Sequence, residues 1–285
     1  MRRVTERNAM RELSRAWRGR GERVGLVPTM GNLHRGHLEL VDRLAGCVDR
    51  LVVSIFVNPL QFGPGEDYDA YPRTLDADLA ALQGRGVDAV FAPTAREMYP
   101  GVEPPWTGVD VPALTQTLCG AARPGHFAGV AVVVIKLLNI VEPDAAAFGR
   151  KDYQQLQVVR RVVADLDLPV EIVEVPVVRE DDGLALSSRN GYLDAEQRRR
   201  APALYVTLRE LAAALEAGRR DWQQLEAEAC RRLEAAGFDA AEYVAVRRCD
   251  DLAEPRGDEP RLVCLGAARL GTARLIDNVE ARLNR

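Results

Sequence analysis

The chain has 285 residues, of which 47% are hydrophobic and 28% charged, enough to bury one large globular domain or two moderate ones. Its net charge of −4 offers no basic field to a nucleic-acid backbone, so we expect no nucleic-acid partner. The five cysteines are scattered and form no Cys-x-x-Cys pair, which disfavours a zinc ribbon and a disulfide framework.

No segment has the pattern of a targeting or membrane-spanning sequence. The first residues, MRRVTERNAMREL, are charged throughout and do not resemble a signal peptide. The longest apolar run, from Val130 to Val141, contains Lys136 and is too short to span a bilayer. We therefore expect a cytoplasmic protein without membrane association.

The first 178 residues alternate buried-strand patterns with helical patterns. We expect strands at 23–29, 51–58, 88–94, 144–149 and 170–178, and helices at 37–46, 74–86, 130–141 and 152–166. This alternation predicts an α/β fold, with a Rossmann-like parallel sheet domain over 1–178 that helices cover on both faces. Ligands of such sheets bind beyond the carboxyl ends of the strands, so the loops that follow strands are the candidate sites.

The pattern changes after Val178. A polar, turn-rich segment leads into two amphipathic helical patterns and three strand-like pieces, at 195–217, 221–236, 241–248, 261–271 and 272–281. We predict a smaller α+β C-terminal domain over 179–285, with the polar segment as its hinge. Within it, EPRGDEPR is expected to be a surface loop.

The stretch VPTMGNLHRGHLEL follows the first predicted buried strand and holds His34 and His37, three residues apart. Zinc binding is one interpretation, but the third histidine is distant and no cysteine lies nearby. Capping of a turn is a second. In the third, Gly31 and Gly36 let the backbone approach a phosphate, and the following helix offers free N–H groups. A histidine at such a helix start has a lowered pKa and serves as a neutral hydrogen-bond donor or a late-charging acid.

The segment FGRKDYQQ places a lysine directly after a predicted strand. Among the 38 lysines and arginines only Lys136 and Lys151 are lysines. A compact ammonium suits a point contact with phosphate, which favours a functional Lys151, although chance composition would also explain it. Lys136 lies in an apolar helical pattern, where we expect its stem to pack and its ammonium to reach water.

Two further segments have polar patterns suited to ligands. In LALSSRN, two adjacent serine hydroxyls precede Arg189 and could wrap a polyphosphate. The tripeptide Ser-Ser-Arg is, however, also common in ordinary turns. Gln61, just after an Asn-Pro pair, suits a small hydroxy acid, although turn chemistry alone would explain the pair. Arg123 and His126 of RPGHFAG either lie near a substrate or form a structural loop.

Taken in order, several segments resemble the pantothenate synthetases, or pantoate–β-alanine ligases, of the His-x-Gly-His nucleotidyltransferase superfamily. The segments cover nearly the whole chain: PTMGNLHRGH, SIFVNPLQFG, YPRTLDADL, EMYP, RPGHFAGV, FGRKDYQQL, DGLALSSRN and ARLIDN. The resemblance implies an ATP-dependent condensation of (R)-pantoate with β-alanine to pantothenate, AMP and pyrophosphate through a pantoyl adenylate, a step towards coenzyme A. It also implies a C-terminal domain that closes over the ATP site, a homodimer and a requirement for Mg²⁺.

The resemblance also assigns roles to residues. His37, His34 and Lys151 would be catalytic, with His37 as the proton donor, and Gln61 and Gln155 would hold pantoate, with Gln61 also meeting β-alanine. The ATP site would comprise Met30, Gly31, Asn32, Leu33, His34, Arg35, Gly36, His37, Gly149, Arg150, Lys151, Asp152, Val178, Leu186, Ser187, Ser188 and Arg189.

The metal prediction rests on the TLDADLAAL segment. Asp78 would ligate Mg²⁺, but Ala77 stands where some relatives carry another carboxylate. Asp76 and Asp78 could equally be acids favoured at the start of a helix.

Three other functions stay open at this stage. One is a related nucleotidylyltransferase that acts on a different small molecule without needing an amine. A second is a small class I aminoacyl-tRNA synthetase relative, which the acidic net charge disfavours. The third is a nucleotide-binding regulator without catalysis, which the presence of His34, His37, Lys151 and Arg189 disfavours.

Overall fold

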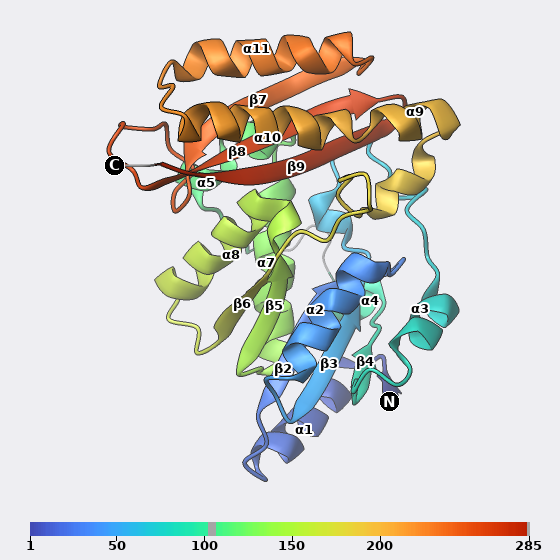
Figure 1. The fold of residues 1–285 in the computed structure, drawn as a ribbon. Coiled ribbons are helices and arrows are strands. Elements are labelled where there is room, and N and C mark those ends of the chain that lie inside the picture. Colours follow the sequence, from blue (N-terminus) through green and yellow to red (C-terminus); the bar gives the residue numbers. More distant parts are fainter. Residues whose placement is uncertain (102–106, 284–285) are drawn as a thin grey trace.

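The computed structural model describes residues 1–101 and 107–283, and within these ranges the chain forms two sheets (Figure 1). The larger sheet has six parallel strands in the order β1-β4-β3-β2-β5-β6. The smaller sheet has three antiparallel strands in the order β7-β8-β9. The predicted α/β fold with a smaller α+β C-terminal domain is thereby confirmed. The boundary after Val178 stays a prediction, and the last two residues of that domain lie outside the described ranges.

The five strands predicted for the first domain are present, and a sixth was not predicted. The strands are β1 (Arg2–Val4), β2 (Val24–Thr29), β3 (Arg50–Ile55), β4 (Ala89–Phe91), β5 (Ala145–Gly149) and β6 (Glu171–Val175). The missed strand, β1, is short and begins with two arginines, so it has no apolar run. It pairs in parallel with β4 at the sheet edge.

The four helices predicted for this domain are also present, but the first helix of the chain and three short ones were not foreseen. The helices are α1 (Arg7–Arg18), α2 (Arg35–Ala45), α3 (Leu75–Leu82), α4 (Ala95–Met98), α5 (Pro112–Thr115), α6 (Leu118–Ala122), α7 (His126–Val141) and α8 (Tyr153–Asp165), with 3-10 turns η1 (Pro59–Gln61) and η2 (Arg150–Asp152). In α1 the charged residues mask a narrow stripe of Met10, Ser14 and Trp17, which is buried.

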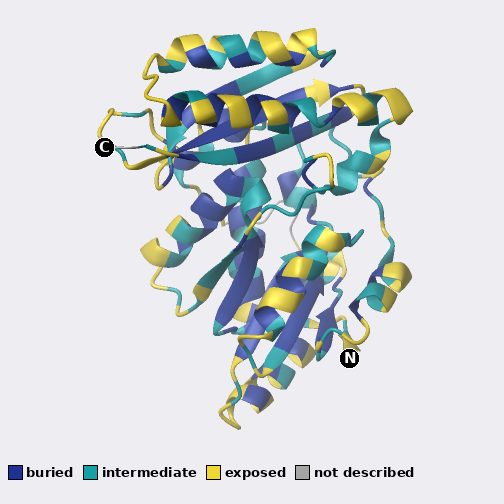
Figure 2. Ribbon diagram, viewed as in Figure 1, coloured by how far each residue is buried: buried dark blue, intermediate teal, exposed yellow. Residues whose placement is uncertain are grey.

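Side chains that alternate along the central strands build two cores, one on each face of the parallel sheet. Leu26 and Val52 pack in the core that contains α1, α7 and α8. Their neighbours Val27 and Val53 pack in the core that contains α2. Because successive residues of a strand point to opposite faces, these short apolar runs serve both layers. Figure 2 shows the central strands buried beneath partly exposed helices.

The C-terminal domain places two helices on one face of its sheet. Its elements are η3 (Ser188–Tyr192), α9 (Ala195–Arg200), α10 (Ala203–Glu216), α11 (Trp222–Ala235), β7 (Ala240–Arg248), β8 (Arg261–Leu270) and β9 (Ala273–Arg282). The prediction of one helix over 195–217 is wrong, because a turn at Ala201–Pro202 separates α9 from α10. Pro202 has no backbone N–H to continue α9, and its fixed φ is suited to the start of α10.

The other face of the small sheet packs on the first domain. In β8, Leu262 and Cys264 belong to the core beneath α10 and α11. The alternate residues Val263 and Leu265 belong to a separate cluster that contains Tyr153 of α8. The small sheet is therefore apolar on both faces, and one face joins the two domains.

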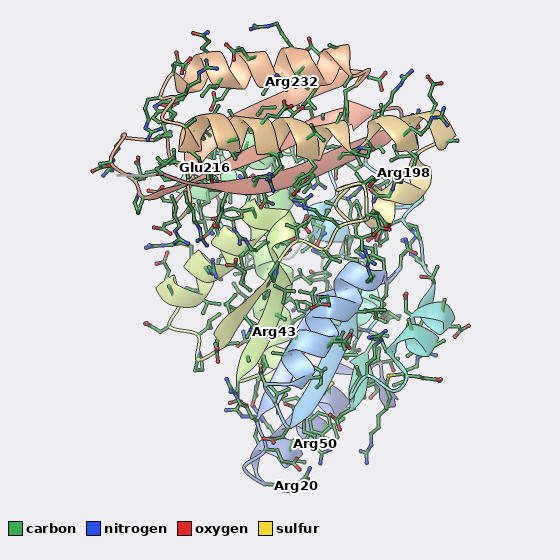
Figure 3. All side chains as sticks on the ribbon, in the orientation of Figure 1. Arg20, Arg43, Arg50, Arg198, Glu216 and Arg232 are labelled. Atoms are coloured by element: carbon green, nitrogen blue, oxygen red, sulfur yellow. The ribbon has the colours of Figure 1, made fainter. Side chains whose placement is uncertain are left out.

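Charged side chains project from both domains. Arg20, Arg43, Arg50, Arg198 and Arg232 are spread over both domains (Figure 3). No helix within residues 1–101 and 107–283 combines the length and apolarity that a bilayer span requires.

A glycine near the start of α7, Gly129, lets the turn η1 pack against this helix. A Cβ built on Gly129 would lie 2.1 Å from the carbonyl oxygen of Leu60. The Gly129 carbonyl accepts a hydrogen bond of 3.1 Å from the side chain of Asn58. The missing side chain therefore fixes how closely Gln61, the last residue of η1, approaches the helix.

We predict that Gly129→Ala lowers the free energy of unfolding by at least about 1 kcal/mol. Alanine gains up to about 1 kcal/mol in helix propensity, but a Cβ at 2.1 Å from a backbone oxygen places the overpacking cost at about 3 kcal/mol, the upper end of its usual range, or above. Urea denaturation followed by circular dichroism measures the difference. In the control, Gly46→Ala, the new Cβ would meet the Arg43 carbonyl oxygen at 3.8 Å, and stability should be unchanged or slightly higher. Wild-type stability in Gly129→Ala would contradict this packing.

Candidate active site

A pocket of about 660 Å³ lies between the two domains, at the carboxyl ends of β2 and β5. Within the described strands, the pairing of β2 with β5 covers Gly25–Leu26 and Ala145–Ala146 and ends before either strand does. The helix after β2 packs on one face of the sheet and the helix after β5 on the other. Such a reversal leaves a crevice between neighbouring strand ends, and ligands of open α/β sheets bind there.

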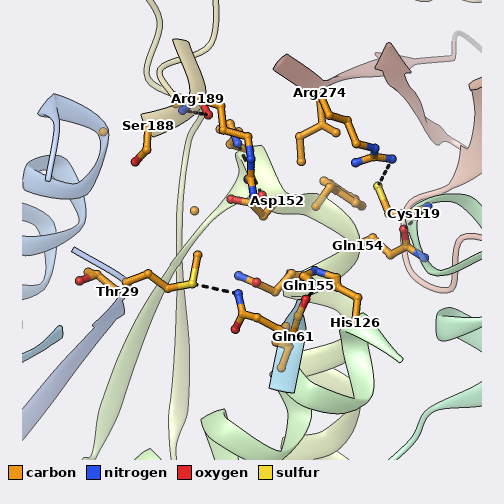
Figure 4. Close-up of a pocket in the computed structure, with 18 of the residues that line it drawn as sticks. Thr29, Gln61, Cys119, His126, Asp152, Gln154, Gln155, Ser188, Arg189 and Arg274 are labelled. Carbon is orange, nitrogen blue, oxygen red and sulfur yellow. Dashed lines mark hydrogen bonds and ion pairs between the residues drawn. The ribbon is translucent and has the colours of Figure 1, made fainter. Parts of the chain in front are cut away.

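Most of the predicted site residues line this pocket. They are Met30, His34, Gly36, His37, Gln61, Gly149, Lys151, Asp152, Gln155, Val178, Leu186, Ser187, Ser188 and Arg189, joined by Arg123 and His126. Segments more than 150 residues apart in the chain thus meet at one place, as the resemblance implied. Figure 4 shows Gln61, Gln155 and His126 together on one side of the pocket, with Asp152, Ser188 and Arg189 across from them.

Five predicted ATP-site residues lie outside the pocket lining, namely Gly31, Asn32, Leu33, Arg35 and Arg150. Three of them form the loop that follows β2, which Asp78 of α3 holds. The Asp78 carboxylate accepts hydrogen bonds from the main-chain N–H groups of Asn32 (3.0 Å) and Leu33 (2.7 Å). Gly31 has a φ of +81°, and a Cβ there would lie 2.9 Å from the same carboxylate. These residues shape the loop that carries the histidines.

The same contacts bear on the metal prediction for Asp78. Its side chain is 2% exposed, and Thr74 Oγ1 donates a third hydrogen bond of 3.2 Å to it. In the described part of the chain no group of three or more histidine, cysteine, aspartate or glutamate side chains is arranged to hold a metal ion. The structure therefore gives Asp78 a loop-anchoring position, and its donors leave it poorly suited to the predicted metal contact.

His34 and His37 cap the start of α2 reciprocally. The backbone N–H of Gly36 donates to Nδ1 of His34 (3.1 Å), and the backbone N–H of His34 donates to Nδ1 of His37 (3.3 Å). A nitrogen that accepts an N–H cannot itself carry the proton, so each neutral ring is protonated on Nε2. The ring centroids are 4.0 Å apart. The turn-capping and phosphate interpretations are thus compatible, because capping through Nδ1 leaves an Nε2–H donor on each ring.

Both histidines are held neutral near pH 7. Burial lowers the pKa of His34 to about 4, helped by the charge of Lys151. Burial, with His34 beside it, lowers the pKa of His37 to about 3. Positive charge at the start of a helix is unfavourable as well. The pair therefore offers hydrogen bonds rather than cations to a ligand.

Among the predicted ATP-site residues that line the pocket, Lys151 and Arg189 carry the positive charge. The Lys151 ammonium lies 3.5 Å from a carboxylate oxygen of Asp152. Desolvation would raise the pKa of Asp152, but the charges of Lys151 and Arg189 outweigh it and the pKa is lowered. Asp152 is thus ionised, and its negative charge lies near the positive charges of Lys151 and Arg189.

Arg189 is paired with an acid that the sequence did not single out. Its Nη2 and Nε lie 3.0 and 3.2 Å from the two carboxylate oxygens of Asp67. Ser187 Oγ accepts the main-chain N–H of Arg189 (3.2 Å), and Ser188 Oγ donates to the Asn32 carbonyl oxygen (3.4 Å). The Ser-Ser-Arg segment therefore contacts the loop after β2 and the loop after η1.

Gln61 is fixed from several sides. Its Oε1 accepts a hydrogen bond from Asn58 Nδ2 (3.1 Å), and Asn58 Oδ1 accepts one from the Tyr99 hydroxyl (2.8 Å). Nδ1 of His126 donates to the Gln61 carbonyl oxygen (2.7 Å), which the Arg123 guanidinium also approaches at 3.3 Å. Of the two interpretations for RPGHFAG, the structure supports both in part, because Arg123 and His126 line the pocket and brace Gln61.

Other walls of the pocket carry residues to which the sequence analysis gave no role. Val130, Val133 and Val134 of α7 give the pocket an apolar wall beside Gln61. The small sheet contributes Tyr243 and Arg274, which face the pocket across the domain junction. Their positions depend on the docking of the small sheet, which no local pattern records.

The chain is similar to proteins of one kind along its whole length. The family described as pantoate-beta-alanine ligase matches residues 2–280. A pantothenate synthetase of Halorhodospira halophila is 91% identical over 285 residues, which cover 100% of both chains. Another, from Alkalilimnicola ehrlichii, is 56% identical and covers 100% of this chain and 99% of its own.

Solved structures agree. The pantothenate synthetase of Thermus thermophilus superimposes with a TM-score of 0.88 at 48% identity, over 98% of this chain and 99% of that one. A pantoate-beta-alanine ligase from Francisella tularensis, complexed with beta-gamma ATP and beta-alanine, has a TM-score of 0.82 at 30% identity, over 98% and 97% of the two chains.

The neutral state of His34 predicts a pH dependence of stability. A folded-state pKa of about 4 lies below the unfolded value of about 6.5, so acid protonates the unfolded chain first. Wild-type stability should therefore fall as the pH drops from about 6.5 towards 4. Asparagine keeps a cap acceptor but does not titrate, so His34→Asn should lose less stability than wild type between pH 8 and pH 5. Urea denaturation at both pH values measures the two losses.

The matched control is His34→Ala, which has no cap acceptor. At pH 8 it should be about 1 kcal/mol less stable than His34→Asn. An equal acid-induced loss in wild type and His34→Asn would show that His34 is not held neutral in the folded protein.

Proposed function

The chain belongs to the pantoate–β-alanine ligase family, and on this premise we propose that it joins pantoate to β-alanine at the expense of ATP in the pocket between its two domains. The arrangement that carries the proposal is the meeting of two kinds of group in one cavity. Neutral N–H donors and two cations, suited to phosphate, face Gln61 and Gln155, suited to a hydroxy acid. The Francisella tularensis relative, complexed with beta-gamma ATP and beta-alanine, supports the choice of ligands.

In the first step the pantoate carboxylate attacks the α-phosphorus of ATP. An oxygen–phosphorus bond forms to give pantoyl adenylate, and the bond to the bridging oxygen breaks to release pyrophosphate. Nε2–H groups of His34 and His37 would donate to phosphate oxygens as negative charge gathers on them. With a pKa of about 3, His37 acts in this scheme as a hydrogen-bond donor, which refines its expected role as the proton donor. Lys151 would neutralise phosphate charge.

In the second step the neutral amine of β-alanine attacks the acyl carbon. The amide C–N bond forms, the acyl–oxygen bond to AMP breaks, and the proton lost from the amine is released with AMP. Gln61 would hold the pantoyl group and meet the amine, and Gln155 would hold the pantoyl hydroxyl. The apolar wall from α7 suits the two methyl groups of pantoate. Both reactions use one pocket, so the substrates are held close without release of the adenylate. The C-terminal domain would keep water from that intermediate by closing over the site.

We also propose that Mg²⁺ enters as part of the ATP substrate, held by phosphate oxygens and water rather than by Asp78. The full set of predicted ATP contacts stays part of this proposal, with Gly31, Asn32, Leu33, Arg35 and Arg150 acting from behind the pocket wall. A homodimer and a cytoplasmic location are proposed from the family resemblance alone.

The test supplies ATP and Mg²⁺ with pantoate, with and without β-alanine, and measures AMP, pyrophosphate and pantothenate. Pantothenate should form only with all three substrates, in equal amounts with AMP. AMP formation that is indifferent to pantoate and β-alanine would overturn the ligase proposal. An adenylyl product that is released and accumulates over many turnovers without an amine would favour the related nucleotidylyltransferase.

The two lysines of the chain provide a matched pair of variants. Methionine keeps the stem and removes the ammonium, so Lys151→Met should lower kcat/KM for ATP by about 100-fold or more while the protein stays folded. Lys136→Met should remain within about threefold of wild type, because the Lys136 ammonium lies outside the pocket, 5.5 Å from the Tyr99 ring. Steady-state kinetics and thermal unfolding measure both. Near-normal turnover in Lys151→Met would show that its role is wrongly assigned.

A further inference from the structure

An asparagine from the small sheet grips the loop that carries Lys151. Asn278 of β9 donates through Nδ2 to the main-chain carbonyl oxygens of Arg150 (2.7 Å) and Lys151 (3.1 Å). These two carbonyls lie 128 and 127 positions before Asn278 in the chain, in the turn η2 that follows β5 of the larger sheet. Asn278 is 4% exposed, so water does not replace these bonds if they are lost.

The orientation of the Asn278 amide follows from its partners. Both partners are carbonyl oxygens, which accept hydrogen bonds and cannot donate them. The nitrogen end of the amide must therefore face the loop, and a side chain without a donor cannot make this contact.

The neighbours of Asn278 fix its place. The buried Asp277 accepts two hydrogen bonds from Arg179, at 2.6 and 2.9 Å, and its Oδ1 also accepts the main-chain N–H of Asn278 at 2.7 Å. The Arg179 guanidinium lies 3.8 Å from the centre of the Tyr205 ring. Two residues further along β9, on the same face of the strand as Asn278, Glu280 pairs with the Arg150 side chain.

We propose that Asn278 is a positioning residue that sets the place of the Lys151 ammonium by holding the main chain on which it is mounted. The inference rests on the proposed contact of Lys151 with ATP. A short 3-10 turn carries Lys151, and a displacement of its carbonyls moves the ammonium with them. The contact of Lys151 with phosphate thus depends on correct docking of the small sheet through Asn278. This gives the ARLIDN segment a function that its sequence alone does not indicate.

The test is the affinity for ATP, measured by titration calorimetry on the full chain. Asn278→Ala should weaken ATP binding about 5- to 50-fold, because a displaced Lys151 loses its phosphate contact. In a Lys151→Met background the same substitution should change the affinity less than about twofold, because the ammonium it positions is gone. Equal effects in both backgrounds would reduce Asn278 to a structural residue and overturn the inference.

A second variant gives a readout that a purely structural role does not move. Asn278→Asp has nearly the same shape, but its carboxylate repels the two carbonyls unless it is protonated, and burial favours the protonated form. The affinity of Asn278→Asp for ATP, relative to wild type, should therefore rise between pH 8 and pH 6. A pH-independent ratio would contradict the proposal.

Three controls separate the outcomes. Asn8→Asp makes the same change of charge at an exposed position of α1 and should bind ATP as wild type does. Thermal unfolding shows whether each variant is folded. If Asn278→Ala is unfolded, the test relies on Asn278→Asp. Absent ATP binding in wild type would overturn the proposed function, whereas wild-type binding with unchanged affinity in both Asn278 variants would overturn this inference alone.

Discussion

The reversal of connection between β2 and β5 is the constraint on which the rest of the molecule depends. Pairing between these strands ends after two residues, and the following helices leave for opposite faces of the sheet. Because these helices diverge, the loop with the histidines and the loop with Lys151 both border the pocket at the strand ends. The small sheet docks above this opening and turns a crevice into a pocket. The functional groups that line the pocket therefore gather around these two strand ends.

The same two histidine rings serve the folding of α2 and the proposed chemistry. The Nδ1 atoms of His34 and His37 satisfy backbone N–H groups that a helix start leaves without partners. That use decides which nitrogen carries the proton, and burial keeps the rings neutral. A cap built from serine or aspartate would complete the helix equally well but would present no ring N–H to a phosphate. The motif is therefore explained by two demands at once.

What the sequence predicts well is local. Long apolar runs gave the strands of the first domain, and glycine with histidine or lysine after a strand marked the loops of the site. What it missed depends on residues far apart. Pairing with β4 stabilises β1, and Asp67 matters because Arg189 comes to it across the domains. The metal prediction for Asp78 came from the family resemblance, whereas its hydrogen-bond partners, 45 and 46 positions away, were not visible in its own segment. The break between α9 and α10 is predictable from the sequence, because Pro202 cannot continue a helix.

The pairing of Arg189 with Asp67 has a consequence for how the pocket meets an anion. In the absence of a ligand, the counter-ion of Arg189 is the carboxylate of Asp67 rather than an anion from solution. If a phosphate group binds the Arg189 guanidinium, it replaces the Asp67 carboxylate. Binding is then an exchange of one counter-ion for another. Such an exchange releases fewer ions to the solvent than simple neutralisation does. Ionic strength should then influence nucleotide affinity less steeply than the number of cations in the pocket suggests.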